Sequence, residues 1–181
     1  MKLGAYFLIL LSLFAISFSG YKLFMVYLHP IKYEDEIIFY ANEYTLSPKI
    51  IASVINVESG FDKNAKSNKD AIGLMQIKLN TANYLNQLNN EELITEEDLF
   101  KPTINIKYGC MYLRYLFNKF KDTNTVLAAY NAGETRVKTW LNNKDYSSDK
   151  ITLNYIPYKE TRNYVKKVNN NIKYYKKIYN N

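Results

Sequence analysis

From residue 34 onward, apolar residues recur at the spacing of an α-helix in nearly every segment of the chain. In residues 103–120 the apolar stripe advances in alternating steps of four and three residues, through Ile106, Cys110, Leu113, Phe117 and Phe120. No short run alternates between apolar and polar residues, as a half-buried β-strand would. The sequence therefore predicts an all-α domain, in which the single cysteine is a small core residue.

The helix expected at 47–60 has the clearest limits. Ser47 is a suitable N-cap, Pro48 suits the first helical position, and Gly60 follows the last turn. Shorter helices are expected at 34–44, 80–88, 95–100, 124–131 and 134–141. The last helix should bury an apolar face made of Val165, Val168, Ile172 and Tyr175. Residues 142–157 lack helical periodicity and should form a long loop, which in a compact domain is often functional.

The first 28 residues differ from the rest of the chain. Residues 3–19 are uncharged and mostly apolar, Lys22 follows, and a second apolar run ends at Leu28. Such a segment is either a signal peptide or a membrane anchor. Cleavage after Ser19 would leave the apolar sequence YKLFMVYL exposed, so we expect a retained membrane helix over 1–28. A linker over 29–33 and one domain over 34–181 then account for the remaining residues.

Outside this N-terminal segment the chain is basic. All 17 acidic residues and all but two of the 24 basic residues lie after position 28, which leaves a net charge of about +5 there. The excess is concentrated in residues 158–179. A solvated helix face is the simplest explanation, although an anionic wall polymer or anionic lipid would also suit such a surface. A nucleic acid is not the partner we expect, because only YVKKVNNNIKYYKKIY interleaves basic and aromatic residues.

The sequence contains no motif for a metal or a nucleotide. It has one histidine, one cysteine and no glycine-rich phosphate loop. We therefore expect catalysis or binding without a metal or other cofactor.

Glu58 is the residue that points to chemistry. Ile51, Val54 and Ile55 precede it by seven, four and three residues, so Glu58 shares the buried face of its helix. It also lies in the last turn, where the helix dipole disfavours a negative charge. Burial and dipole should both raise its pKa, and a carboxylic acid that keeps its proton near neutral pH suits general acid catalysis of glycosidic cleavage. A glutamate that turns to solvent or pairs with a lysine is the alternative.

Four segments resemble the ordered motifs of the soluble lytic transglycosylase family, a bacterial group that cleaves peptidoglycan. They are VINVESGFDKNAKS, AIGLMQI, LAAYNAGETRV and YKETRNYVKKV, and the likeness covers about residues 34–175. The resemblance implies a lysozyme-like helical domain with a substrate groove, in which Glu58 is the catalytic acid.

The resemblance also implies substrate-binding roles for seven further residues. Ser67 would face the acetamido region of the sugar, and Met75, Gln76, Tyr130 and Asn131 would line the groove. Glu160 would orient groups near the acid, with Tyr158 beside it. Each has a plainer structural explanation, such as a gap-filling methionine, a packing aromatic or an acidic residue at a helix N-terminus.

The activity implied by the family needs only one glutamate. The acid first protonates the oxygen between N-acetylmuramic acid and N-acetylglucosamine, and then accepts a proton from the muramic C6 hydroxyl, which closes a 1,6-anhydro ring. The sequence departs from the family at Asp70, where glycine is common, and at NAGETRV, where NAGPGRV is common. These departures concern the geometry of two loops.

Two other functions remain open at this point. A hydrolytic muramidase of goose-lysozyme type would deliver water, and Asp62 or Asp70 could supply its second carboxylate. A weakly active glycan-binding module for envelope assembly would keep the groove but little catalysis. In every case we expect an extracytoplasmic protein of the cell envelope, anchored in the membrane, or secreted if the N-terminal segment is cleaved. A secretion or conjugation apparatus that crosses the wall is a possible partner.

Overall fold

The computed structural model describes residues 2–30 and 32–179, which fall into two compact units, 1–30 and 31–181. Four residues lie outside the described residues: Met1 of the predicted N-terminal segment, Ile31 of the predicted linker, and residues 180–181 of the predicted domain. So do the side chains of Lys22 and of several other residues in the two terminal helices.

The first unit consists of helix α1, Lys2–Leu28, followed by a short bend. Near its end, the Nδ1 atom of His29 lies 3.0 Å from the Met25 carbonyl oxygen. Within the part of the chain that the structure describes, no helix combines the length and the apolarity needed to cross a bilayer.

The second unit is mostly helical, as the sequence predicts. Its elements in chain order are α2 (Glu34–Glu43), α3 (Pro48–Ser59), β1 (Ala71–Ile72), β2 (Ile77–Lys78), α4 (Leu79–Asn89), the 3-10 helix η1 (Glu97–Phe100), α5 (Pro102–Lys119), α6 (Thr123–Ala132), α7 (Glu134–Leu141) and α8 (Lys159–Tyr179). The predicted helices agree with these bounds within one or two residues. The segment expected at 95–100 contains a single 3-10 turn, and the Asp98 carboxylate accepts hydrogen bonds from the backbone N–H and the hydroxyl of Thr95, which precedes the turn.

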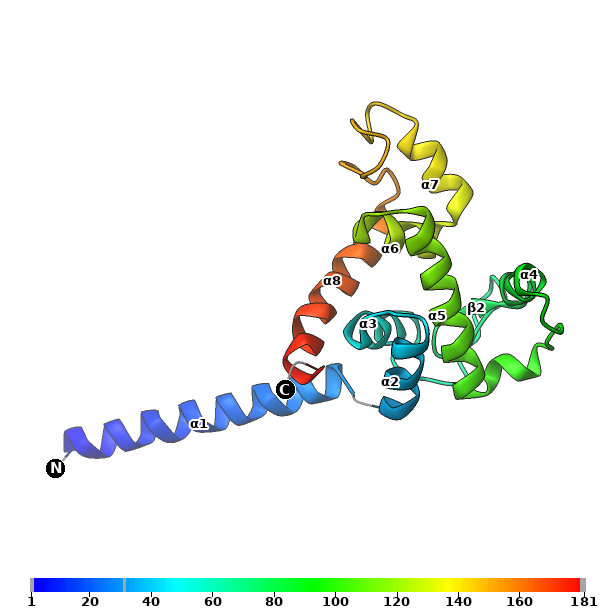
Figure 1. Ribbon diagram of the computed structural model, residues 1–181. Helices are drawn as coiled ribbons and strands as arrows, with labels where there is room; N and C mark the ends of the chain where they lie inside the picture. The colour runs from blue at the N-terminus through cyan, green and yellow to red at the C-terminus, as the bar shows by residue number, and fades with distance from the viewer. Residues whose placement is uncertain (1, 31, 180–181) are drawn as a thin grey trace. The chain divides into compact units, whose positions relative to one another are not determined.

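Helix α3 is the centre of the domain. It packs most extensively against α8 and also against α2, while α5 contacts α2 and α6, and α6 contacts α8 (Figure 1). The buried faces that meet there are strongly apolar, and Ile51, Ile55, Ile106 and Leu113 are fully buried. Burying one such side chain stabilises the fold by roughly 1.5–3 kcal/mol. The apolar stripes read from the sequence are therefore the faces that build the core.

The limits of α3 follow its sequence signals. Pro48 occupies its first turn, and Gly60 ends it in the left-handed region at φ 60°, with its N–H bonded to the Asn56 carbonyl. Ser47 has the extended backbone of an N-cap, but its side chain makes no capping hydrogen bond. The helix therefore ends at a fixed point immediately after Glu58 and Ser59.

A small antiparallel hairpin is the part of the fold that the sequence does not predict. Strands β1 and β2 pair Ala71 with Lys78 and Ile72 with Ile77, and Lys66 forms an isolated bridge with Ile72. Each strand has two residues, which is too short to give an alternating pattern. The prediction of an all-α domain is therefore corrected to a mostly helical one with a hairpin.

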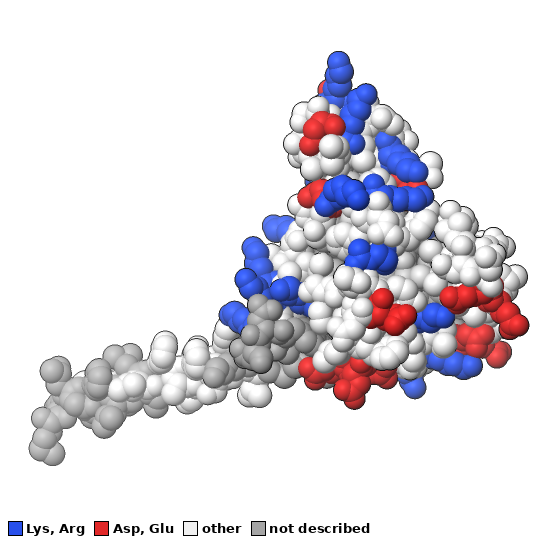
Figure 2. Space-filling model, in the orientation of Figure 1, with Lys and Arg blue, Asp and Glu red and all other residues white. Residues whose placement is uncertain are grey.

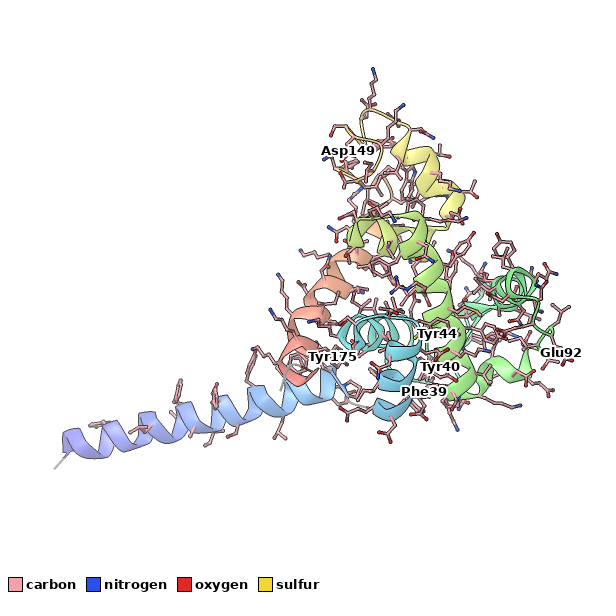
Figure 3. All side chains as sticks on the ribbon, viewed as in Figure 1. Phe39, Tyr40, Tyr44, Glu92, Asp149 and Tyr175 are labelled. Atoms are coloured by element: carbon pink, nitrogen blue, oxygen red, sulfur yellow. The ribbon has the colours of Figure 1, made fainter. Side chains whose placement is uncertain are left out.

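The loop after α7 is ordered by its own polar side chains. Asp149, labelled in Figure 3, accepts hydrogen bonds from the backbone N–H groups of Ile151 and Thr152 and from the Thr152 hydroxyl. These bonds hold the pKa of Asp149 well below its ordinary value. The N–H of Leu153 also donates to the Thr125 hydroxyl of α6, so the loop is fastened to the core.

Charge is unevenly distributed over the domain. Figure 2 shows lysine and arginine side chains along the edge formed by α8 and acidic side chains over the start of α2. The α8 lysines are exposed, whereas the opposite face of that helix is buried against α3 and α6. The structure therefore places the basic cluster read from the sequence on the solvent side of an amphipathic helix.

Candidate active site

Glu58 lies in the last turn of α3, directly before the residues that join the helix to the hairpin. The neighbouring Ser59 hydroxyl donates a hydrogen bond to the Leu74 carbonyl oxygen at 2.8 Å. This bond ties the end of α3 to the segment between β1 and β2. The carboxyl group of Glu58 is therefore carried on a helix end that is fixed to the hairpin.

The pKa of Glu58 is raised from its ordinary 4.5 to about 7. Burial is the dominant cause, because the charged form loses hydration. The Tyr164 hydroxyl works in the opposite direction and lowers the pKa, although the geometry between the two groups falls short of a hydrogen bond. Near neutral pH, Glu58 is thus present both as an acid that can donate a proton and as a carboxylate that can accept one.

A cavity of about 760 Å³ opens beside Glu58. Its lining includes six of the eight site residues predicted from the sequence: Glu58, Ser67, Gln76, Tyr130, Asn131 and Glu160. These come from four separate parts of the chain, namely α3, the hairpin region, α6 and the start of α8. We refer to this cavity as the groove.

The hairpin region forms one wall of the groove, and hydrogen bonds between side chains and the backbone hold this wall together. The Ser67 hydroxyl accepts from the Ala71 N–H at 3.1 Å, and the side-chain Nε2 atom of Gln76 donates to the carbonyl oxygens of Ala65 and Gly73. Gln76 itself has a left-handed backbone, with φ 49°. Both predicted residues thus shape the wall of the groove in addition to lining it.

Met75 does not line the groove. Its side chain is fully buried and touches α5 at Gly109, where an added Cβ would collide with the sulfur. The Met75 backbone accepts a hydrogen bond from the Tyr130 hydroxyl and donates one to Asn105. Met75 therefore supports the hairpin from behind, as a gap-filling residue, and its side chain is not among those that line the groove.

Tyr158 also lies outside the groove. It lines an adjoining cavity of about 470 Å³, together with Trp140, Thr139 and Arg136. The ring of Tyr158 meets the buried Trp140 edge to face, with 5.2 Å between the ring centroids. The linings of the two cavities share Ala132, Gly133 and Arg136, so the cavities lie next to one another.

The opposite wall is made by α6 and the turn that follows it. Tyr130 packs against Tyr112 of α5 with 5.3 Å between centroids, and Asn131 is half-buried beside it. Gly133 then turns the chain at φ 92°, a value that disfavours residues with a Cβ. The AYNAG segment thus brings an aromatic ring and an amide to the groove at a sharp turn between two helices.

Sequence reasoning missed three kinds of residue in the site. Tyr164 falls on the same apolar stripe of α8 as Val165 and Val168, so its helical spacing could have placed it inside, but a tyrosine there reads as core. Asn105 reads as a polar interruption of the α5 stripe. Lys69, Lys78 and Arg136 line the groove as cations, and only their tertiary placement reveals this.

A metal centre is absent from the described part of the chain, where no three His, Cys, Asp or Glu side chains gather as ligands. Asp62 and Asp70 do not line the groove. Asp62 instead accepts from the Asn64 N–H in a local turn, and Asp70 has a left-handed backbone at φ 58°. Neither aspartate is placed to hold a water molecule opposite Glu58.

Comparison with known proteins agrees with the geometry. Residues 35–153 match the family described as "Transglycosylase SLT domain". The soluble lytic murein transglycosylase of Salmonella typhimurium is 34% identical over 142 residues, which are 77% of this chain and 22% of that protein. The membrane-bound lytic murein transglycosylase C of Histophilus somni is 31% identical over 164 residues, covering 77% of this chain and 45% of that protein.

The fold matches solved structures as well. The 70 kDa soluble lytic transglycosylase of Escherichia coli superposes with a TM-score of 0.73 at 30% identity, over 83% of this chain and 25% of that one. The chain thus spans between about a fifth and a half of the length of these relatives. Because the family match extends over more than half of its residues, the chain belongs to the transglycosylase SLT domain family.

Proposed function

We propose that the chain is a peptidoglycan lytic transglycosylase that cleaves the bond between N-acetylmuramic acid and N-acetylglucosamine. The observation that carries the proposal is Glu58, a carboxyl group with a pKa of about 7 that lines a groove of about 760 Å³. The names of the soluble and membrane-bound relatives support murein as the substrate.

The pKa of Glu58 suits two successive proton transfers. The protonated form gives its proton to the glycosidic oxygen as the bond to the muramic C1 breaks. The resulting carboxylate then accepts the proton of the muramic C6 hydroxyl, whose oxygen attacks C1 and closes the 1,6-anhydro ring. Because this hydroxyl is already attached to the sugar, it reacts at a high effective concentration without an activated water.

The remaining groove residues have positioning roles in this proposal. Ser67, Gln76, Tyr130 and Asn131 hold the sugar rings and their acetamido groups along the two walls. Glu160, in the first turn of α8, is the second carboxylate of the groove and would orient groups close to the acid. No cofactor or metal takes part.

The products of the reaction distinguish this function from its alternatives. The full chain would be incubated with purified peptidoglycan beside Glu58→Gln, and the released fragments analysed by mass spectrometry. Anhydromuropeptides that disappear in the variant are expected. Reducing ends instead of anhydro ends would establish a hydrolytic muramidase, and a well-folded wild type that releases nothing would leave only a glycan-binding role.

We also propose that α1 is retained as a membrane anchor and that the domain over 34–181 works in the cell envelope, outside the cytoplasm. The uncharged run over residues 3–19 and the short linker over 29–33 support this, since such a linker would keep the groove close to the membrane. In this position the domain could cleave peptidoglycan where a secretion or conjugation apparatus crosses the cell wall. Amino-terminal sequencing of the mature protein tests the anchor, which a chain beginning after Ser19 would exclude.

A further inference from the structure

Helix α8 carries a face of lysines that the proposed reaction does not use. Its helical spacing gathers them on one side, with Asn163 and Asn170 between them, while Val165 and Val168 on the other side are buried. This side of α8 is the basic edge visible in Figure 2. All of its lysines are exposed, and we refer to them as the basic face: Lys159, Lys166, Lys167, Lys173, Lys176 and Lys177.

The charge of the basic face is not balanced within the domain. The one acidic residue in the sequence of α8 is Glu160, which lines the groove. Among the described residues, the ion pairs join lysines of other elements to carboxylates, and none includes a lysine of α8. Lys173 lies one turn from both Lys176 and Lys177, and like charges at these spacings destabilise a helix. A face that is merely solvated usually mixes charges of both signs, so the basic face calls for an anionic partner.

The form of the basic face limits what that partner can be. None of its lysines lines the groove or the adjoining cavity, so it offers no pocket for a small anion. It is the outer surface of a helix of 21 residues, roughly 30 Å long. Lysine ammonium groups are compact charges on flexible stems and do not form the planar fork that arginine uses to grip one anion. Such an array suits a broad surface of negative charge.

The aromatic residues of α8 do not share the basic face. Of the tyrosines in this helix whose side chains the structure describes, Tyr164 and Tyr175 are buried and Tyr174 is half-buried, with its ring edge to face against Tyr175 at 5.8 Å. Binding to a single-stranded nucleic acid needs exposed rings between the cations, on which bases can stack. From Asn163 to Lys177 the exposed residues are lysines and asparagines alone.

We propose that the basic face of α8 docks on a lipid bilayer that contains anionic headgroups. Clusters of about four to eight basic residues on an amphipathic helix bind such bilayers, and each lysine near the surface strengthens binding by about fivefold. A signal peptide and a retained anchor both bring a chain to a membrane, so a bilayer is available on either interpretation of residues 1–28. Because the exposed residues of the face are polar, the contact is electrostatic and needs no insertion into the hydrocarbon.

Docking through α8 would set the position of the groove relative to the lipid. Glu160, in the first turn of this helix, lines the groove, and α8 packs along α3, which carries Glu58. A bilayer that holds α8 therefore holds the acid at a fixed height above its surface. The docking is separate from the proposed function, because its test measures no cleavage.

The test measures how closely α8 approaches the lipid in the full chain. A fluorescent dye is attached at Asn170→Cys, in the middle of the basic face, while the native Cys110 is buried and does not compete for the label. Energy transfer to an acceptor on the headgroups is compared between vesicles of phosphatidylcholine and vesicles that also contain phosphatidylglycerol. We expect transfer to be at least about twofold higher with the anionic lipid. The excess should disappear in about 1 M salt, where charges are screened within about 3 Å.

A triple variant tests the lysines themselves. Lys166→Gln, Lys167→Gln and Lys173→Gln together should remove the excess transfer and lower the preference for anionic over neutral vesicles by about 100-fold, from three factors of about five. Arginine at the same three positions should preserve both. The matched control changes three exposed lysines of two loops that line neither cavity: Lys63→Gln, Lys144→Gln and Lys150→Gln. It removes the same charge and should behave as wild type.

Three results would overturn the proposal. Equal transfer on the two kinds of vesicle would show that α8 does not approach anionic lipid. An equal loss in the control variant would show that net charge acts without any particular face. Double-stranded DNA or poly(glycerol phosphate), added at the same phosphate concentration as the lipid, should leave the chain on the vesicles, and displacement by either would assign the face to a linear polyanion instead.

Discussion

The hydroxyl group of Tyr130 donates a hydrogen bond to the backbone carbonyl of Met75 at 2.8 Å. This single bond connects α6, on one side of the groove, to the hairpin on the other, across 55 residues of sequence. It also explains how two of the most distinctive segments in the chain, GLMQ and AYNAG, come to act as one unit. The buried Met75 belongs to the site through its backbone and not through its side chain.

Tyr130→Phe should therefore loosen the hairpin wall without removing the aromatic ring. We expect the free energy of unfolding to fall by about 1–2 kcal/mol, since the Met75 carbonyl loses its partner at a partly buried position. The turnover number should fall as well, because the wall positions the substrate beside Glu58. Chemical denaturation and initial rates measure the two effects. Tyr27→Phe, at an exposed tyrosine of α1, is the control, and unchanged values in both variants would contradict the role given to this bond.

The raised pKa of Glu58 predicts how activity depends on pH. Cleavage needs the protonated acid, so kcat/KM should decline as pH rises through about 7. Glu58→Gln should lower the rate by about 10²–10⁴-fold or more at every pH. A pH profile between 5 and 9 with purified peptidoglycan measures this limb. A profile that stays flat across neutral pH would show that Glu58 does not act as an acid with this pKa.

The same titration should be visible in stability, with a definite sign. Between pH 4.5 and about 7 the folded protein keeps the Glu58 proton that the unfolded chain releases, so stability decreases over this interval as pH rises. Relative to wild type, Glu58→Gln should gain roughly 2–3 kcal/mol above pH 7 and nothing below pH 4.5. Urea denaturation at pH 4.5 and pH 8 measures the difference. A gain that is equal at both values would have to come from something other than this carboxyl group.

Tyr164 gives a way to move the pKa of Glu58. Its hydroxyl faces the carboxyl group and lowers that pKa, while making no hydrogen bond of normal geometry among the described residues. Tyr164→Phe should therefore shift the alkaline limb of the pH profile to higher pH and alter stability little. Tyr175→Phe, at a fully buried tyrosine further along α8, should leave the limb unchanged. A limb that stays in place in Tyr164→Phe would remove Tyr164 from the control of the acid.

The helical part of the fold was predictable because it follows from local spacing. The stripe through Ile106, Cys110 and Leu113 and the limits of α3 at Pro48 and Gly60 are encoded within a few turns of chain. The same spacing placed Glu58 on the buried side of its helix. It therefore also predicted that burial would raise the pKa of Glu58.

The hairpin and the second cavity could not be read in this way. The hairpin depends on Asn105, which accepts from the Met75 N–H and donates to the carbonyl oxygens of Ile72 and Leu99. Met75 and Ile72 lie 30 and 33 residues away from Asn105 in the sequence. A polar residue within an apolar stripe gives no sign of which backbone groups it will satisfy. Likewise, the position of Tyr158 over Arg136 depends on how the loop after α7 returns to α8. Such contacts are set by tertiary packing, which local periodicity does not describe.

Glu134 follows the AYNAG segment directly, at a position where the family motif named above commonly has proline, and the structure gives this glutamate a role. Its carboxylate lies 2.7 Å from Lys119, 2.5 Å from Lys138 and 2.8 Å from the Tyr115 hydroxyl, so it joins α5 to the start of α7. Burial works to raise its pKa, but these hydrogen bonds outweigh that effect and lower the pKa from 4.5 to about 2. The ionised form is therefore the one that stabilises the fold.

Glu134→Gln should lower the free energy of unfolding by about 1–2 kcal/mol at pH 7, since a charge-assisted cluster at a mostly buried carboxylate is lost. A lowered pKa stabilises the folded state above pH 4.5, and this contribution disappears as pH falls toward 2. The deficit of the variant should therefore shrink over that interval. A double-mutant cycle with Lys119→Met should give a coupling of roughly 0.5–1 kcal/mol at pH 7. Zero coupling, together with a deficit that does not change with pH, would mean that Glu134 contributes through packing alone.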